Sequence, residues 1–307
     1  MRAAILITLL LTATSSPLGQ TTARSNSSNP FLDREPPPIP AEAKRDMETK
    51  LDEARDRYRA NANDPEASIW VGRRLAYLGR FREAIVFYTD AIKKFPRDAR
   101  LYRHRGHRYI TTRQFALAIK DLTTAARLTK GKPDELEPDG QPNARNIPTS
   151  TLQFNIWYHL GLAYYLTGNN PKALAAYREC LKVSNSPDRL VATSHWLYMT
   201  LRRLNRRPEA AKVLAPVGPQ MDIIENRGYY RLLLMYKGSV TLEALRDEAL
   251  KEGSSAGSHS ILYGIGNWYL YNGNRTEANR VFQQMLIGDQ WTSFGYIAAE
   301  AEMKRLQ

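Results

Sequence analysis

The chain has 307 residues, with 44 Lys and Arg against 31 Asp and Glu, and a formal net charge of +13. A hydrophobic fraction of 43% argues against a wholly disordered chain. A single cysteine excludes an internal disulfide and a cysteine-based zinc or iron–sulfur site. This length predicts two globular domains or one extended array.

Residues 1–23 follow the layout of a secretory signal peptide. Arg2 precedes the apolar run 3–13, and small and polar residues follow it. The run is shorter than the ~20 apolar residues that a membrane-spanning helix needs. Two small-x-small patterns, ending at Ser16 and at Ala23, leave the cleavage point open. We therefore expect an exported protein, periplasmic or secreted, whose mature chain has no integral membrane span.

The next two segments differ sharply in composition. Residues 24–40 are rich in Ser and Asn and then in Pro, which predicts a disordered, semi-extended linker. In the segment 41–62, Leu51, Ala54 and Tyr58 fall on one face of a helical pattern. This segment is predicted to be a helix that covers the first unit of the domain that follows.

From Pro65 onward the sequence repeats itself with a period of 34 residues. The matching pairs are Gly72 and Gly106, Phe81 and Phe115, Ala84 and Ala118, Ile85 and Ile119, and Ala91 and Ala125. A third unit opens at Phe154 and has the spacing W-x2-L-G-x2-Y from Trp157 to Tyr164. Five matches at one offset indicate a true internal repeat.

This pattern resembles the tetratricopeptide repeat, a helix–turn–helix unit of 34 residues. The resemblance implies an all-α fold, an α-solenoid of stacked units with N- and C-terminal capping helices, over residues 41–307. The expected units lie at about 65–98, 99–132, 154–187, 191–218, 221–252 and 259–288. The Pro-rich, acidic stretch 131–150 is predicted to be an inserted loop, and 290–306 a final capping helix.

The spacing of small and bulky residues has a physical reason. Small side chains at unit positions 8 and 20 let two helix axes approach to about 8–10 Å. We therefore expect glycine at position 8 to face alanine at position 20, and bulky residues at positions 4, 11 and 24 to fill the space between units. No unit buries its apolar face alone, so stacking is obligatory.

In the family, the first helices of the units line a concave groove that binds peptides. The resemblance therefore implies a partner-binding groove made of Trp70, Arg73, Tyr77, Arg100, Arg103, His104, His107, Tyr158, His159, His195, Trp196 and Arg202. Aromatic residues and arginine dominate binding hot spots, and arginine forms bidentate contacts with carboxylates. The other interpretation of Trp70 and Trp196 is packing between units.

The positive charge is concentrated in one part of the chain. Residues 65–130 hold 15 basic and 5 acidic residues. This predicts a protein or peptide partner, acidic or extended, at one end of the groove. The alternative is a polyanion binder that uses the first two units on nucleic acid, anionic lipid or a wall polymer. Nucleic acid is the weakest of these partners, because an exported protein seldom meets it.

No motif predicts catalysis, a cofactor or a metal. The segment 253–257 matches G-x-S-x-G, but no strand pattern precedes it, so a helix–helix loop is expected in place of a nucleophile elbow. His104 and His107, with His159 or His195, could ligate zinc, but no carboxylate or cysteine completes the set. The sequence therefore predicts a non-enzymatic scaffold without cofactor or metal, and it leaves the oligomeric state open.

Overall fold

A computed structural model describes residues 29–253 and 255–306, and the predicted signal peptide lies outside them. Within these residues the fold is all-α, with fourteen α-helices and a single isolated bridge between Leu136 and Thr151. None of the helices described is long and apolar enough to cross a membrane.

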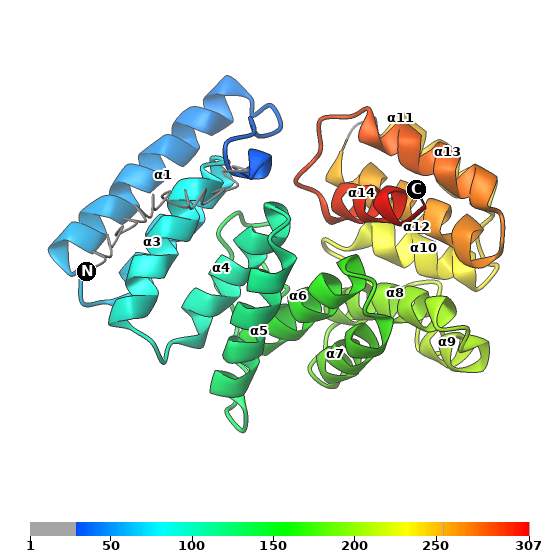
Figure 1. Cartoon of the computed structure of the whole chain (residues 1–307), viewed down its shortest axis with the longest axis horizontal. Helices are drawn as coiled ribbons and strands as arrows, with labels where there is room; N and C mark the ends of the chain where they lie inside the picture. Colours follow the sequence, from blue (N-terminus) through cyan, green and yellow to red (C-terminus); the bar gives the residue numbers. More distant parts are fainter. Residues whose placement is uncertain (1–28, 254, 307) are drawn as a thin grey trace, which may run out of the picture.

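The helices form an arch of stacked pairs (Figure 1). Helix α1 (Ala41–Ala60) precedes the pairs, and α14 (Phe294–Leu306) follows them. The six pairs are α2 (Pro65–Tyr77) with α3 (Phe81–Lys94), α4 (Ala99–Thr111) with α5 (Phe115–Thr129), α6 (Leu152–Leu166) with α7 (Asn170–Lys182), α8 (Pro187–Arg203) with α9 (Arg207–Val213), α10 (Arg227–Tyr236) with α11 (Leu242–Lys251), and α12 (Ala256–Tyr271) with α13 (Arg275–Leu286). Asp64 and Asp98, one period apart, cap α2 and α4 through their side chains.

The turn inside five of the pairs uses a left-handed residue at unit position 15. These residues and their φ angles are Gly79 (75°), Arg113 (59°), Gly168 (75°), Asn205 (57°) and Gly273 (90°). Glycine adopts this conformation without a steric cost, whereas a residue with a Cβ pays for it. Asparagine, as at Asn205, tolerates this conformation better than other residues with a Cβ, so Arg113 is the costly case among the five.

Glycine at position 8 packs against the bulky residue at position 24 of its own helix pair. A Cβ added at each glycine would lie too close to one side chain: Gly72 to Tyr88 (2.3 Å), Gly106 to Leu122 (2.8 Å), Gly161 to Tyr177 (2.6 Å) and Gly266 to Phe282 (2.5 Å). The bulky residue thus fills the gap within its own helix pair. The missing side chain at position 8 makes room for it.

Replacing Gly161 by leucine is expected to lower the free energy of unfolding by about 1–3 kcal/mol. The ring of Tyr177 is fully buried, so it cannot move aside for the new side chain. Gly218→Ala is the matched control, because a Cβ there meets nothing within 4 Å. Urea unfolding of both variants measures the difference. An unchanged midpoint for Gly161→Leu would contradict this packing.

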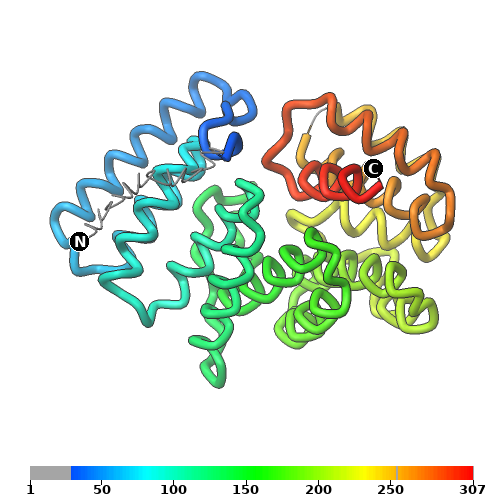
Figure 2. The backbone as a smooth tube through the Cα atoms, in the orientation of Figure 1, coloured from blue at the N-terminus to red at the C-terminus, as the bar shows by residue number. Residues whose placement is uncertain are grey.

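The two ends of the arch are joined by the C-terminal segment (Figure 2). Trp291 and Tyr296 belong to the hydrophobic core of the first units. The indole Nε1 of Trp291 donates to the carbonyl of Glu35 (2.7 Å), and its ring meets Phe81 edge-on at a centroid distance of 5.7 Å. The solenoid is therefore closed on itself through this segment.

Arg113 completes the closure. Its guanidinium donates to the Trp291 carbonyl (2.8 Å) and forms an ion pair with Glu300 of α14 (2.9 Å). It also lies 4.2 Å from the ring centroid of Phe31. Arg113, despite the steric cost of its left-handed backbone, thus connects unit two to helix α14.

Residues 29–40 are packed against the fold, which corrects the prediction that this part of 24–40 is a disordered linker. They begin with a short 3₁₀ turn, η1 (Pro30–Leu32). Phe31 packs on Trp291 at a centroid distance of 5.9 Å, and Asp33 forms a two-bond ion pair with Arg82. Composition alone missed this, because a few specific contacts, with Trp291 and Arg82 among them, anchor the proline-rich segment.

Candidate functional site on the concave face

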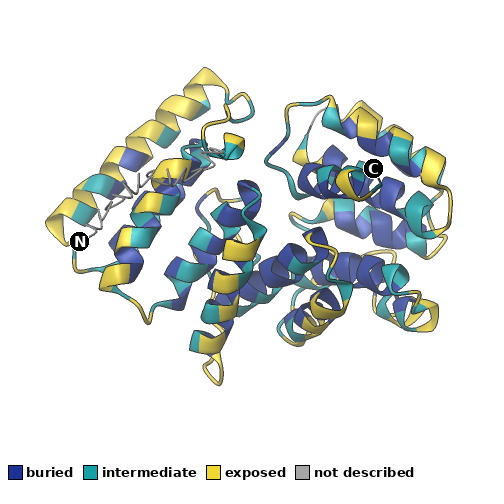
Figure 3. Cartoon of the chain, viewed as in Figure 1, coloured by how far each residue is buried: buried dark blue, intermediate teal, exposed yellow. Residues whose placement is uncertain are grey.

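The first helices of the units face the inner side of the arch. Helices α2, α4, α6 and α8 contact one another in sequence, and α12 contacts α8. They carry many of the buried residues of the fold (Figure 3). Seven of the twelve predicted groove residues are buried: Arg73, Arg103, His104, Tyr158, His159, His195 and Trp196. The others, Trp70, Tyr77, Arg100, His107 and Arg202, are half-buried.

The inserted loop 131–150 covers the α2 end of this face. Arg74 donates to the carbonyl of Gly140 (2.9 Å), and the backbone of Gly140 lies so close to Tyr77 that no side chain would fit. Tyr77 in turn accepts a hydrogen bond from Arg73 Nε (3.1 Å). The guanidinium of Arg73 also lies 4.5 Å from the ring centroid of Trp70. Trp70, Arg73 and Tyr77 therefore form one assembly on α2.

Arg103 is paired with a carboxylate of the same loop. Its guanidinium forms an ion pair with Glu137 (2.8 Å) and donates to Nδ1 of His104 (3.0 Å). Because arginine is only a donor, Nδ1 of His104 accepts and the imidazole is neutral with its proton on Nε2. Burial, followed by the nearby arginines, holds the pKa of His104 well below its usual range. Glu137 was missed by the sequence reasoning, although the acidic character of the insertion was its available signal.

Helix α14 covers the next part of the face. Phe294 packs on His107 and His159, with ring centroids 5.4 and 5.6 Å away. The two imidazoles lie 4.4 Å apart. Burial, followed by neighbouring positive groups, holds the pKa of both well below the usual range. The structure thus brings these predicted residues together, but under the chain's own helix.

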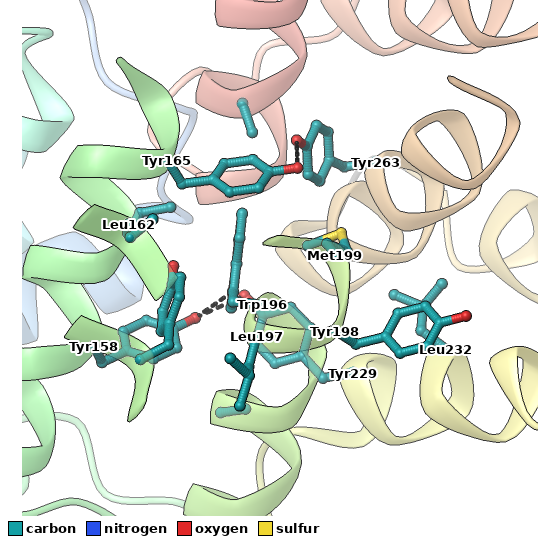
Figure 4. Packing of buried hydrophobic residues seen from close by; sticks show 14 of the residues in the cluster. Tyr158, Leu162, Tyr165, Trp196, Leu197, Tyr198, Met199, Tyr229, Leu232 and Tyr263 are labelled. Atoms are coloured by element: carbon teal, nitrogen blue, oxygen red, sulfur yellow. Dashed lines mark hydrogen bonds between the residues drawn. The ribbon is translucent and has the colours of Figure 1, made fainter. Parts of the chain in front are cut away.

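Two of the three residues predicted on α8, His195 and Trp196, lie in the interior. Trp196 is 1% exposed and His195 is 0% exposed. Trp196 Nε1 donates to the hydroxyl of Tyr158 (2.8 Å), which donates to the hydroxyl of Tyr229 (3.1 Å), as Figure 4 shows. These contacts support the packing interpretation of Trp196. Three predicted groove residues therefore belong to the core and are out of reach of a partner: His195, Trp196 and Tyr158.

The two remaining arginines also have partners within the chain. Arg100 pairs with Glu66 (2.5 Å) and Asp98 (2.6 Å). Arg202 donates to Asn272 (2.7 Å) and thereby links α8 to the end of α12. Within residues 65–130, Arg105 pairs with Asp121 and Arg80 with Glu83. Acids from outside this block offset part of its basic excess, as Glu137 does for Arg103 and Glu300 for Arg113.

A cavity of about 350 Å³ remains open on the concave side. It lies between the first two units, the proline-rich residues 36–39 and the C-terminal segment. Its polar lining comprises Tyr77, His107, Arg108, Thr111, Gln141, Gln290 and Thr292. Arg108 stands at unit position 10, outside the positions expected to face the groove, so it was not among the predicted site residues.

Arg108 has no carboxylate partner among the residues described. Its guanidinium lies over the face of Phe81, 5.6 Å from the ring centroid. Burial, and then the charges of Arg103 and Arg73, lower the pKa of Arg108 to about 10. It remains protonated at neutral pH. The cavity therefore presents an uncompensated cation, next to two further arginines that share Glu137 as their nearby carboxylate.

The residues that could suggest catalysis or metal binding have other roles in the described structure. Ser255 caps α12 by accepting from the backbone N–H of Ser258 (3.0 Å). Helix α11 precedes it, where a nucleophile elbow requires a strand. Over residues 29–253 and 255–306, no group of three or more His, Cys, Asp or Glu is close enough to hold a metal ion.

Part of the repeat array is similar to known proteins. Residues 154–186 match the sequence profile described as "Tetratricopeptide repeat". Two proteins of Homo sapiens are similar to part of the chain: Tetratricopeptide repeat protein 7B (27% identity over 168 residues) and Tetratricopeptide repeat protein 13 (32% over 108). The alignments cover 53% and 35% of this chain, which spans 20% and 10% of those relatives.

Similar solved structures include YrrB, described as "a TPR protein with an unusual peptide-binding site". The match has a TM-score of 0.44 and 15% identity, and it covers 82% of this chain and 97% of that one. A putative kinesin light chain from Podosopora anserina with TPR-like repeats has a TM-score of 0.41 and 15% identity, covering 79% and 99%. Residues 154–186 therefore form a matched tetratricopeptide repeat within an array of stacked helix pairs, an arrangement that suggests a protein-interaction scaffold.

Proposed function

We propose that this protein is a non-enzymatic scaffold that binds an acidic segment of a partner protein, with a carboxylate of that segment entering the concave cavity at Arg108. The observation that carries the proposal is the guanidinium of Arg108, which lines the cavity without a carboxylate partner in the described residues. A carboxylate from outside would complete a bidentate pair with it.

The charge around the cavity favours an anion. The charges of Arg73 and Arg103 lower the pKa of Arg108, and Glu137 compensates Arg73 and Arg103 but not Arg108. His107 adds no positive charge at neutral pH, because its pKa is held well below the usual range by burial. An entering carboxylate would therefore offset an existing excess of positive charge.

The size and the lining of the cavity suit a side chain or a chain end. A volume of about 350 Å³ lies at the lower end of the range for ligand sites, ~300–1,000 Å³. Tyr77, Thr111, Gln141 and Gln290 offer hydrogen bonds around Arg108. The cavity is too small for a folded partner, so the contact is expected to be one anchoring residue of a larger surface.

Arg108→Gln is expected to weaken binding of acidic peptides by about tenfold or more, because a charge-assisted hydrogen bond contributes ~1.5–3 kcal/mol. The probe is an array of short synthetic peptides rich in Asp and Glu, with matched Asn and Gln versions. The variant is expected to fold, because it removes a half-buried charge that has no partner. Binding is measured by fluorescence anisotropy.

Arg97→Gln is the matched control, because Arg97 is exposed and lies away from the cavity. Equal affinities for Arg108→Gln and the wild type would overturn the role of Arg108. Binding of any polyanion that collapses between roughly 50 and 200 mM salt would favour the polyanion alternative.

A further inference from the structure

A second recess lies on the opposite side of α6 from the concave face. It has a volume of about 720 Å³ and runs between α5 and α7, with α6 as its floor. Trp157, Leu160 and Tyr164 lie on one face of α6 at spacings of three and four residues. Tyr158 and His159, on the other side of the helix, meet Phe294. The two sites are therefore separate.

The floor of this outer groove is apolar and accessible. Leu160 and Ala176 form its base, while Trp157, Tyr164 and Ala175 remain partly or fully exposed. Trp157 and Tyr164 occupy unit positions 4 and 11, which were predicted to fill the space between units. Here they leave apolar surface open to solvent between units two and three.

The rim of the outer groove is basic. Arg127 and Lys130 lie at the end of α5, and Lys172 lies at the start of α7. No carboxylate pairs with these three side chains in the part of the chain that the structure describes. Glu179, the acidic residue of the rim, already pairs with Lys182 (2.6 Å). The rim thus presents three uncompensated positive charges.

The aromatic residues of the groove are poorly placed to stack with nucleotide bases. The ammonium group of Lys172 lies over the ring of Tyr164, 5.6 Å from its centroid. Trp157 is half-buried among residues of two core clusters. Base stacking requires open ring faces, whereas an apolar side chain needs only an accessible recess. The lining therefore favours a peptide over single-stranded nucleic acid.

We propose that the outer groove between α5 and α7 is a second docking site, which takes an acidic segment of a partner protein that carries a large apolar side chain. The apolar side chain lies on Trp157, Leu160 and Ala176. The acidic residues of the segment pair with Lys130, Lys172 and Arg127. This site is independent of the Arg108 cavity, so one scaffold can hold two segments on opposite faces.

Ala175→Arg is the discriminating variant. It fills the exposed side of the groove while it adds a positive charge to the rim. If attraction to charge alone drove binding, Ala175→Arg would bind acidic peptides more tightly than the wild type. If binding also needs the apolar floor, Ala175→Arg would no longer bind these peptides. Ala211→Arg on α9 is the matched control, because Ala211 is also an exposed helical alanine and lies outside the groove.

The probe is a displayed library of random peptides, selected on the wild-type protein and counter-selected on Ala175→Arg. The expected survivors combine Asp or Glu with Leu, Phe or Trp. Their affinity should fall about tenfold in the double variant Lys130→Glu, Lys172→Glu. It should be unchanged in Lys120→Glu, an exposed α5 control, and in Arg108→Gln, which keeps this test separate from the concave site.

Two outcomes would overturn the proposal. One is a selection that yields no peptides sensitive to Ala175→Arg. The other is a poly-thymidine oligonucleotide that binds the wild type and is lost in both groove variants, which would assign the groove to nucleic acid. Circular dichroism of each variant confirms that lost binding does not reflect lost folding.

Discussion

Lowering the pH from about 7 to about 5 is expected to reduce the free energy of unfolding by several kcal/mol, with the loss beginning near pH 6.5. Four histidines carry this effect. Burial lowers the pKa of His195 to about 3. Burial also holds the pKa values of His104, His107 and His159 well below the usual range, and the positive charges of Arg103 and Arg108 add to it.

The direction of the effect follows from proton binding. The pKa of each imidazole is lower in the folded chain than in the unfolded chain, where it is about 6.5. Between these two values the unfolded chain binds a proton that the folded chain does not, so acid favours unfolding. The contribution to stability is complete above about pH 6.5 and is lost as the pH falls toward the folded pKa.

The magnitude is large because several groups act in one direction. For His195 alone, a shift from an unfolded pKa of about 6.5 to about 3 corresponds to a loss of about 2 kcal/mol between pH 7 and pH 5. The other three histidines contribute with the same sign. Because a domain is stable by only ~5–15 kcal/mol, acid unfolding is expected well above the pKa of the carboxylates.

His195→Phe separates this mechanism from general acid effects. The substitution keeps an aromatic ring between Tyr229 and Tyr236, whose centroids lie 4.7 and 6.0 Å from the imidazole. Nε2 of His195 has no hydrogen-bond partner within the described residues, and Nδ1 lies 3.5 Å from the hydroxyl of Tyr236, so the substitution removes one long hydrogen bond. Urea unfolding measured across a pH series should have a slope shallower by about 1.4 kcal/mol per pH unit below pH 6.5. Identical slopes in the variant and the wild type would contradict this origin.

The helix pairs were predictable because their signals are local and periodic. Gly72 and Gly106, or Ala84 and Ala118, recur at the period of the unit, and each reports a close approach of neighbouring helices. The nearest side chain to each glycine was not predictable, because the period sets positions along the helix and not the choice of contact partner. The bulky residue at position 24 was expected to fill the space between units, and it packs against the glycine of its own helix pair.

The candidate site was less predictable, because exposure depends on segments remote in sequence. Trp196 has a residue type and a helix position typical of binding grooves, yet Tyr158 and Tyr229 enclose it. Glu137 of the insertion and Phe294 of α14 cover Arg103 and His159. Nothing in the 34-residue period indicates that these segments fold back onto the concave face.

Closure of the arch is the clearest case of such a remote contact. Trp291 and Glu35 are 256 residues apart, and Arg113 and Glu300 are 187 apart. A repeat array is stabilised mainly by contacts between neighbouring units, so its ends normally unfold independently. Contacts between the first and last units instead couple the two ends, and they determine what remains open at the Arg108 cavity.

Trp291→Ala is therefore expected to lower the free energy of unfolding by about 3–5 kcal/mol, as is usual for deleting a large buried aromatic side chain. Trp291 is 1% exposed, packs on Phe31 and Phe81, and donates to the Glu35 carbonyl. Urea unfolding followed by circular dichroism measures the loss. The variant should also unfold in two steps, because removing the tryptophan uncouples the first units from the last.

Ile287→Ala provides the control within the same segment. Ile287 is 86% exposed, so its truncation is expected to change stability by no more than about 0.5 kcal/mol. Hydrogen exchange supplies a local readout, since amides in residues 29–40 and at the start of α3 should exchange faster only in Trp291→Ala. A stability loss below about 1 kcal/mol, with unchanged exchange there, would show that the C-terminal segment rests on the first units without holding the arch closed.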